Sequence, residues 1–463
     1  MSNLVLETDN NTVAIERMQA RRAPRLLRNL ELALTLFALF ISILAVLNVE
    51  WGAIGKLQHT LFWPGIGVVA LVIGLHIAIR FVAPDADPLL LPAAAALNGI
   101  GIAEIYRIDI AEQLVGWDST AIRQLLWTAI ALIAAGALLV LLRNHLVLFK
   151  YTYISGLVAV ILLLLPMLPG LGVEQFGAKV WISIGPFSFQ PGEIAKIVLA
   201  VFFAGYLVRN KDALSMVGRK FAGISFPRGR DLGPILVFWL IAMAVLVFQR
   251  DLGTSLLYFG LFLVMIYIAT GRTGWVVIGV SLFVAGALIA SQTLDYVNAR
   301  FQNWLNPFDP AVFEADRGSY QLVQGLFGMA NGGMTGTGLG QGFPQDTPLA
   351  QSDYIIPSLG EELGLIGLFV ILSLYLLLIG RGLRIGFAAQ DDFGKLLAVG
   401  LAFGLALQVF IVIGGVTRVI PLTGLTAPFL AAGGSSLMSN WLIVALFIRL
   451  SNSIRNKPKL VIR

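Results

Sequence analysis

The sequence predicts an all-α polytopic membrane protein of about twelve transmembrane helices. Of its 463 residues, 57% are hydrophobic and 13% are charged, whereas an ordinary soluble domain has about 25% charged residues. A spanning helix needs roughly 20 apolar residues, and stretches such as 125–142 and 235–248 recur along the whole chain. We therefore expect one membrane domain to take up nearly the entire sequence.

Polar and charged segments separate the apolar stretches into twelve predicted spans. These are 30–49, 61–82, 88–105, 124–142, 151–168, 193–208, 232–248, 254–270, 275–291, 362–380, 396–416 and 424–450. No small-residue cleavage site follows the polar N-terminus, so the first span is expected to be retained.

The distribution of Lys and Arg predicts that both termini are cytoplasmic. With the spans alternating from a cytoplasmic N-terminus, 23 of the 32 Lys and Arg residues fall on the cytoplasmic side and eight fall outside, as the positive-inside rule expects. This topology explains the net charge of +6, and no basic stripe with interleaved aromatic residues suggests nucleic-acid binding. The protein is thus expected to be a multi-pass membrane protein with both termini on the cytoplasmic side.

Several kinds of site are excluded by composition or spacing. The chain has no cysteine, which rules out disulfides, thiolate metal sites and cysteine nucleophiles. Its three histidines, His59, His76 and His145, are scattered. No Ser-His-Asp or metal-ligand spacing appears, and nothing indicates a nucleotide or redox cofactor.

Two predicted external loops, 169–192 and 292–361, are too long to be simple connectors, and function often lies in such loops. In the longer loop Tyr320, Val323 and Phe327 recur at helical spacing. Two glycines at 332–333 would end that turn. We expect a short helix that lies on the outer membrane surface.

The string QPGEIAK places Glu193 and Lys196 three residues apart, on one helical face at the membrane surface. One interpretation is an intrahelical ion pair whose lysine snorkels outward. The other is a role in holding a diphosphate, because an ammonium group is a common phosphate ligand. In the string QRDLGTS, Asp251 is expected to cap the next helix, while Arg250 is a candidate second cation.

The glycine-rich string GGMTGTGLGQG is a weak nucleotide signal, because no Lys-Ser/Thr follows it and no strand precedes it. Its amides could cradle an anionic head group, although hinging is the favoured interpretation. Asp353 precedes an apolar run, so its carboxylate should lie at the outer membrane surface. Glu361 and Glu362 are interpreted as first-turn acids that complement a helix N-terminus.

These motifs together resemble the SEDS family (shape, elongation, division and sporulation), and the RodA type more than the FtsW type. The matching strings, from about residue 88 to the C-terminus, are GAKVWISIGPFSFQPGEIAK, QRDLGTS, NPFDP with Tyr320-Gln321 after it, ANGGMTGTGLGQG, SDYIIPSLGEELG and IPLTGLTAPFLAAGGSS.

The resemblance implies a ten-helix core, with a catalytic aspartate in the large external loop that Asp353 matches. It gives these expected parts: cytoplasmic N-terminus 1–28, two extra helices 29–83, core 88–450 with loop 292–361, and tail 451–463. The substrate-binding candidates on the matching strings are Gln190, Glu193, Lys196, Arg250, Tyr320, Gln321, Gly338 and Glu362.

The resemblance also implies a function. The expected activity is an inverting peptidoglycan glycosyltransferase that polymerises lipid II, an undecaprenyl-diphosphate-linked disaccharide pentapeptide, for elongation or division. The expected partner is a class B penicillin-binding protein. The diphosphate leaves during the reaction, so cations or a divalent metal, Mg²⁺ or Mn²⁺, would assist. Two alternatives stay open: a lipid II flippase, and a scaffold for the transpeptidase.

Three motifs depart from the family pattern, at four positions. Gly192 stands where members usually have serine, Arg250 stands where they have proline, and Ala431 and Ala432 precede the final glycines where they have serine and tyrosine. The lost hydroxyl groups put the role of that last loop in question.

Overall fold

The fold is a bundle of long helices with small accessory sheets. The computed structural model describes residues 2–175, 177–184, 187–215, 217–221, 224–227 and 233–455. The basic tail beyond Arg455, together with Arg228 and Arg230, lies outside the described residues.

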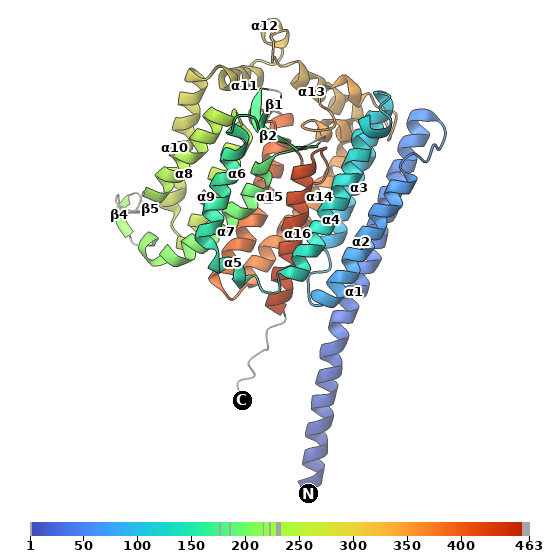
Figure 1. Ribbon diagram of the computed structural model, residues 1–463, viewed down its shortest axis with the longest axis vertical. Helices are drawn as coiled ribbons and strands as arrows, with labels where there is room; N and C mark the ends of the chain where they lie inside the picture. The colour runs from blue at the N-terminus through green and yellow to red at the C-terminus, as the bar shows by residue number, and fades with distance from the viewer. Residues whose placement is uncertain are drawn as a thin grey trace.

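The longer helices of the described residues run along the bundle (Figure 1). They are α1 (Ser2–Ile54), α2 (Phe62–Val82), α3 (Leu90–Ala111), α4 (Thr120–Leu141), α6 (Thr152–Leu164), α7 (Pro191–Leu214), α8 (Gly233–Gln249), α9 (Leu252–Thr270), α10 (Thr273–Thr293), α14 (Ile355–Ala388), α15 (Asp392–Val416) and α16 (Gly434–Arg455).

Apolar length supports the helical membrane class. Within the described ranges, nine of these helices are long and apolar enough to cross a membrane, while α6 and α8 are apolar but shorter. Helix α3 carries Glu104, Arg107 and Asp109. The membrane fold is thus confirmed, and the count of twelve spans stays a prediction.

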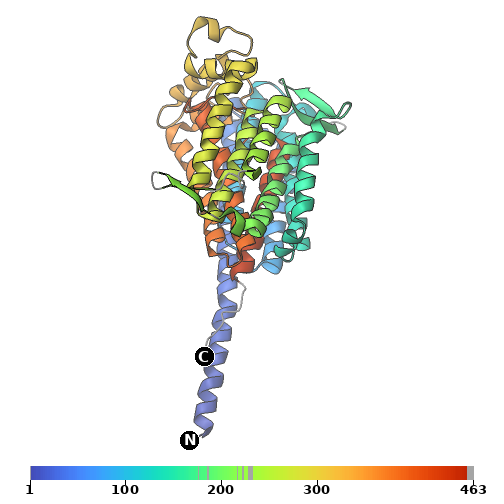
Figure 2. The ribbon, with the colours of Figure 1, turned by 90° about the vertical axis from the view of Figure 1, so that its left-hand side faces the viewer.

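Short elements gather at one end of the bundle, which we call the loop end (Figures 1 and 2). It carries the sheet β1 (Gly172–Gln175), β2 (Ala178–Ile184) and β3 (Phe187–Phe189), and the helices α11 (Asp295–Leu305), α12 (Pro310–Phe313) and α13 (Tyr320–Gly332). The start of α1 and the end of α16 lie at the opposite end, so the chain crosses the bundle an even number of times.

The sequence did not predict the strands. The three-stranded antiparallel sheet occupies the predicted loop 169–192, and a second antiparallel pair, β4 (Val217–Phe221) with β5 (Ile224–Pro227), follows α7. Short helices α5 (Leu146–Lys150), η1 (Gly116–Asp118), η2 (Leu165–Met167) and η4 (Pro344–Asp346) complete the described elements. The predicted helical membrane fold is confirmed, and these small sheets are additions that the sequence did not predict.

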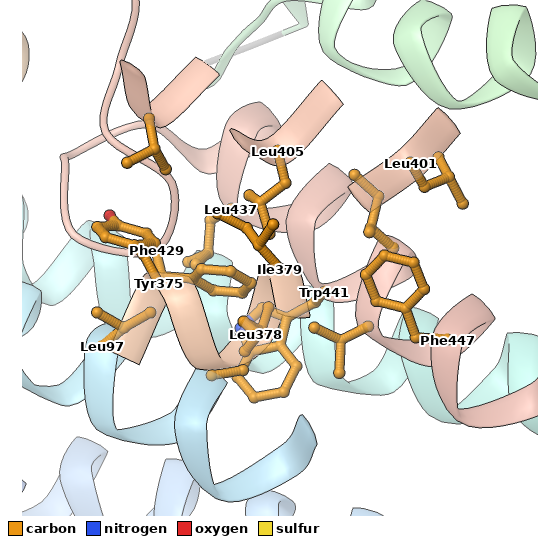
Figure 3. Packing of buried hydrophobic residues seen from close by; sticks show 14 of the residues in the cluster. Leu97, Tyr375, Leu378, Ile379, Leu401, Leu405, Phe429, Leu437, Trp441 and Phe447 are labelled. Atoms are coloured by element: carbon orange, nitrogen blue, oxygen red, sulfur yellow. The ribbon is translucent and has the colours of Figure 1, made fainter. Parts of the chain in front are cut away.

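Only the second part of the last predicted stretch, which proline and glycine interrupt, is helical. Its first part, from Gly424 to about Gly433, is not helical, and α16 begins only at Gly434. This segment folds into the bundle, where the Phe429 and Trp441 rings meet edge to face with centroids 5.8 Å apart (Figure 3). Tyr375 donates a 2.5 Å hydrogen bond to the Pro428 carbonyl. Irregular backbone is tolerated here because it is enclosed by protein.

Helix α14 is interrupted at Gly364, whose φ of +68° and ψ of −173° are not helical. A helix break leaves backbone groups unpaired, which is costly in a membrane. The glycine-rich segment 333–338 fills the break: Leu365 and Ile366 donate to the carbonyls of Gly333 and Met334, at 2.9 and 3.1 Å. A Cβ at Gly364 would lie 2.3 Å from the Gly336 nitrogen. Only glycine permits this approach.

The acids Glu361 and Glu362 are not first-turn acids, because α14 already begins at Ile355. Glu362 is fully buried and accepts from Arg107 Nε at 2.8 Å. Its oxygens also accept from the backbone amides of Gly340 and Gly342, at 2.8 and 3.2 Å. The glycine-rich loop therefore does cradle an anion, and that anion is a carboxylate of its own chain.

Helix α1 reaches the same loop by close backbone contact. A Cβ at Gly52 would lie 2.2 Å from the Leu339 carbonyl oxygen, and one at Gly340 would lie 2.7 Å from the Ala53 nitrogen. The N-terminal helix is thus packed against the loop that the break in α14 anchors.

We predict that Glu362→Gln destabilises the folded protein by about 3–5 kcal/mol, because it leaves the buried Arg107 guanidinium without its counter-charge. Thermal unfolding in one detergent would measure the change. Glu314→Gln, at an exposed position in the long loop, is the matched control and should unfold like the wild type. Equal stability of the two variants would show that the Arg107 pair does not hold the loop.

Candidate active site

A polar cavity of about 250 Å³ opens at the loop end. Its polar and charged lining includes Arg250, Arg300, Arg317, Asn303, Gln321 and Asp353. These residues come from the junction between α8 and α9, from α11, from the start of α13 and the segment before it, and from the segment before α14. The hairpin turn between β1 and β2 also contributes, through Gly177 and Ala178. Both loops that the sequence singled out therefore meet in this cavity.

Asp353 is positioned by the residue that follows it. Tyr354 is fully buried, and its ring packs against Gly325 of α13, where a Cβ would lie 2.7 Å from Cδ1. Because Tyr354 is fixed between α13 and α14, the neighbouring Asp353 side chain is half-buried at the cavity wall.

Arg300 is the cation that acts on Asp353. Its Nη1 donates to the Leu422 carbonyl at 3.1 Å. A Cβ built on Gly424 would lie 3.4 Å from Asp353 Oδ2 and 3.7 Å from Arg300 Nη2, so both charged groups lie beside this glycine. Gly424 has a φ of +79°, a conformation that favours glycine.

Burial raises the pKa of Asp353 to about 6, although the Arg300 charge lowers it and the Asp251 charge adds to the rise. A carboxyl group with this pKa is mainly ionised at neutral pH and still binds a proton readily. Such tuning is typical of a general base that works near pH 7.

Arg250 lies at the cavity rim, about half exposed, and has a left-handed φ of +56°. Its guanidinium is 3.9 Å from Glu174 of β1. Asp251 accepts from the Thr254 amide at 2.9 Å, so the predicted capping role is confirmed. The cap directs the side chain of Asp251 to its own helix, while Arg250 faces the cavity.

Lys196 and Glu193 do not line this cavity. Their side chains form the predicted intrahelical ion pair, 2.7 Å apart. The lysine does not snorkel outward, however, because it is buried and donates to Gln408 and Asn440 at 3.0 and 3.4 Å. Glu193 accepts from Ser439 at 3.1 Å. The pair ties α7 to α15 and α16 inside the bundle.

The other predicted substrate-binding residues are spread out. Gln321 lines the cavity and donates to the Pro348 carbonyl at 2.7 Å. Tyr320 is exposed and stacks edge to face on Phe313 instead. Gln190 precedes α7 away from the cavity lining. Gly338 donates its amide to the Glu362 carbonyl at 2.9 Å.

The predicted surface helix exists as α13, and Gly333 ends it as expected. Its buried face differs from the prediction: Leu322, Val323 and Gly325 are buried, whereas Phe327 is 56% exposed. The helix packs on the start of α14 through this face.

Sequence reasoning missed Arg300 and Arg317. Both stand in the same long loop as Asp353 and were counted among the external cations that the topology assigns. Their location in the same loop as Asp353 could have indicated that they lie near it in the fold. Arg317 lies against the β1–β2 turn, where a Cβ on Gly177 would be 3.1 Å from its Nη2.

Among the described residues, no group of three or more His, Cys, Asp or Glu side chains is arranged to hold a metal ion. Among the residues that the structure describes, Asp353 is the one carboxylate that lines the cavity.

Comparison with known proteins identifies the family. The family model for FtsW, RodA and SpoVE, described as cell cycle proteins, matches residues 88–456. The chain belongs to this family. It is 46% identical over 432 residues to the peptidoglycan glycosyltransferase RodA of Mycobacterium tuberculosis, covering 92% of this chain and 91% of the relative. It is 32% identical over 378 residues to stage V sporulation protein E of Bacillus subtilis, covering 80% and 98%.

Solved structures share the fold of this family member. Crystalline RodA of Thermus thermophilus matches 81% of this chain and 98% of its own, with a TM-score of 0.56 and 24% identity. A chain from a peptidoglycan synthase complex, solved for the coordination of polymerisation and crosslinking, matches 86% and 98% with a TM-score of 0.54 and 23% identity.

We predict that Lys196→Met destabilises the protein by about 3–5 kcal/mol, because Glu193 would be left buried without its counter-charge. Lys179→Met, at an exposed position 3.7 Å from Glu174, is the control and should change stability little. Thermal unfolding of both variants tests this. A Lys196→Met protein as stable as wild type would contradict the internal role of the pair.

Proposed function

We propose that this protein is a peptidoglycan glycosyltransferase that polymerises lipid II into glycan strands. The observation that carries the proposal is one cavity that combines a carboxylate, Asp353, with the guanidinium groups of Arg250, Arg300 and Arg317. Family membership and the 46% identity to RodA proteins named for this activity support it.

The reaction needs a base and a site for negative charge. The acceptor sugar's 4-hydroxyl oxygen attacks the anomeric carbon of the donor, and the bond from that carbon to the diphosphate oxygen breaks. The hydroxyl proton passes to the Asp353 carboxylate, and the diphosphate leaves with the bonding electrons. A single displacement of this kind inverts the anomeric carbon.

The three arginines suit the leaving group. Guanidinium groups bind phosphate oxygens in bidentate fashion, and preorganised cations stabilise charge that develops in the transition state. Arg250, Arg300 and Arg317 therefore replace Lys196 as the proposed diphosphate ligands, since Lys196 is bonded inside the bundle.

A divalent cation, Mg²⁺ or Mn²⁺, is proposed as an aid to diphosphate departure. Asp353 is the one carboxylate at the cavity in the described part of the chain, so the substrate's own phosphate oxygens would supply most ligands. The cation would neutralise phosphate charge beside the arginines.

The loop end is proposed to face the outside of the cytoplasmic membrane, with both termini inside. The distribution of Lys and Arg supports this orientation. It places the cavity where lipid II presents its sugars after translocation. A class B penicillin-binding protein is the proposed partner, because a fold relative belongs to a complex that coordinates polymerisation and crosslinking.

We predict that Asp353→Asn lowers strand synthesis from labelled lipid II about 10²-fold or more, because the amide keeps the shape but cannot accept the proton. Asp316→Asn, an exposed acid of the same loop outside the cavity lining, is the control. Gel analysis of glycan products by purified protein measures both. Near-normal synthesis by Asp353→Asn would show that Asp353 is not the base, whereas no synthesis by the wild type would favour a flippase or a scaffold.

We predict that Arg300→Met moves the acidic limb of the pH-rate profile upward from about pH 6, because the Arg300 charge lowers the pKa of Asp353. The rate should rise as Asp353 loses its proton, so a higher pKa shifts this rise to higher pH. Arg250→Met should reduce turnover without moving the limb, since Arg250 is not among the charges that set this pKa. An unmoved limb in Arg300→Met would contradict Asp353 as the base.

A further inference from the structure

A second cavity, also of about 250 Å³, lies on the other side of the molecule from the candidate active site. It is enclosed by the N-terminal helices α1 and α2 and by α3 and α4 of the family core. Helix α1 packs mainly on α3, and α2 mainly on α4. The two N-terminal helices thus form side walls over a floor made by the core, and the two cavities share no lining residue.

The walls of this cavity are apolar. Leu39, Val46, Val69 and Val72 contribute side chains from α1 and α2, and Ile102 contributes from α3. Large apolar residues at the rim are exposed, including Ile43 at 48% and Ile66 at 46%. An opening with such a rim faces lipid when the helices span a membrane.

The polar groups on the cavity floor have few free hydrogen-bonding positions for water. Trp441 Nε1 donates to Asn98 Oδ1 at 3.1 Å, and Thr128 Oγ1 donates to the Gln124 carbonyl at 2.8 Å. These groups are already hydrogen-bonded to protein, and a cavity with apolar walls excludes water. Hydrocarbon is therefore the suitable filling.

The loop-end margin of the cavity lies at the level of the lipid head groups. Trp51 and Trp63 flank it and are 65% and 78% exposed, as expected of an interfacial aromatic belt. The turn between them carries the exposed cation Lys56 and the exposed His59, and His59 also lines the cavity.

The acid at this margin is withdrawn from the surface. Glu50 is buried and accepts from the amides of Gln58 and His59, at 3.0 and 3.2 Å, and from the Tyr106 hydroxyl at 3.1 Å. The Glu50 carboxylate is hydrogen-bonded inside the protein, so the charge that the turn exposes at the surface is the Lys56 cation. This favours a negatively charged head group over a neutral one.

We propose that this cavity binds one acyl chain of an anionic phospholipid from the leaflet at the loop end, with its phosphate over Lys56. The separation from the Asp353 cavity argues for a resident membrane lipid and against the polyprenyl chain of the substrate. The site is built by α1 and α2, which precede the residues that the family model matches.

Two glycines of α2 provide a matched test. Gly65 lines the cavity, Gly67 does not, and a Cβ at either would meet nothing within 4 Å. Gly65→Phe should fill the cavity, while Gly67→Phe adds the same ring outside it. Val69→Phe, at a second lining position, repeats the blocking experiment should Gly65→Phe fold poorly.

The measurement is native mass spectrometry of the full chain, titrated separately with phosphatidylglycerol, phosphatidylcholine and undecaprenyl phosphate. We expect one tightly held phosphatidylglycerol on wild type and on Gly67→Phe. In Gly65→Phe the occupancy should fall by about tenfold or more, because the lipid buries fewer methylene groups and its binding weakens steeply. Lys56→Gln should reduce the preference for phosphatidylglycerol over phosphatidylcholine.

Three results would overturn the proposal. Equal lipid retention by Gly65→Phe and Gly67→Phe would place the lipid elsewhere on the protein. Preferential retention of undecaprenyl phosphate would identify a substrate-chain site instead. Failure of wild type to retain any lipid under conditions that keep it folded would leave the cavity without the proposed occupant.

Discussion

The break in α14 is the constraint on which the loop end depends. Inside a membrane, every backbone group freed at a break needs a partner within the protein. Here the partner is the glycine-rich segment 333–338. Just after it, the amides of Gly340 and Gly342 donate to Glu362, whose charge Arg107 balances. Helix α14 can therefore start at Ile355, well before its apolar run. Asp353 lies two residues before this start, so the position of α14 also sets the position of Asp353.

The candidate active site follows from that arrangement and from a balance of charges. Burial raises the pKa of the Asp353 carboxyl group, and the Arg300 charge offsets part of this rise. Arg300, which lowers the pKa of the proposed base, lines the same cavity as Arg250 and Arg317, the other proposed ligands of the diphosphate. The Lys196 ammonium, by contrast, donates its hydrogen bonds to residues of neighbouring helices.

Hydropathy and charge predicted most of the fold, because spans must be apolar whatever their packing. The position of Asp353 before an apolar run, and the capping role of Asp251, also followed from local pattern. Pattern could not predict contacts made across the chain. Arg300 meets Asp353 only through the fold, and Glu362 looked like a first-turn acid because the break at Gly364 is invisible in hydropathy.

The close contact between Gly52 and the Leu339–Gly340 backbone has a consequence for biogenesis. Helix α1 is synthesised well before the loop that it touches, because many of the other helices lie between them in the sequence. During synthesis α1 therefore lacks its final loop-end neighbour, and its docking there is a late step of assembly. A chain stalled before the long loop would hold α1 against α3 but without this last contact.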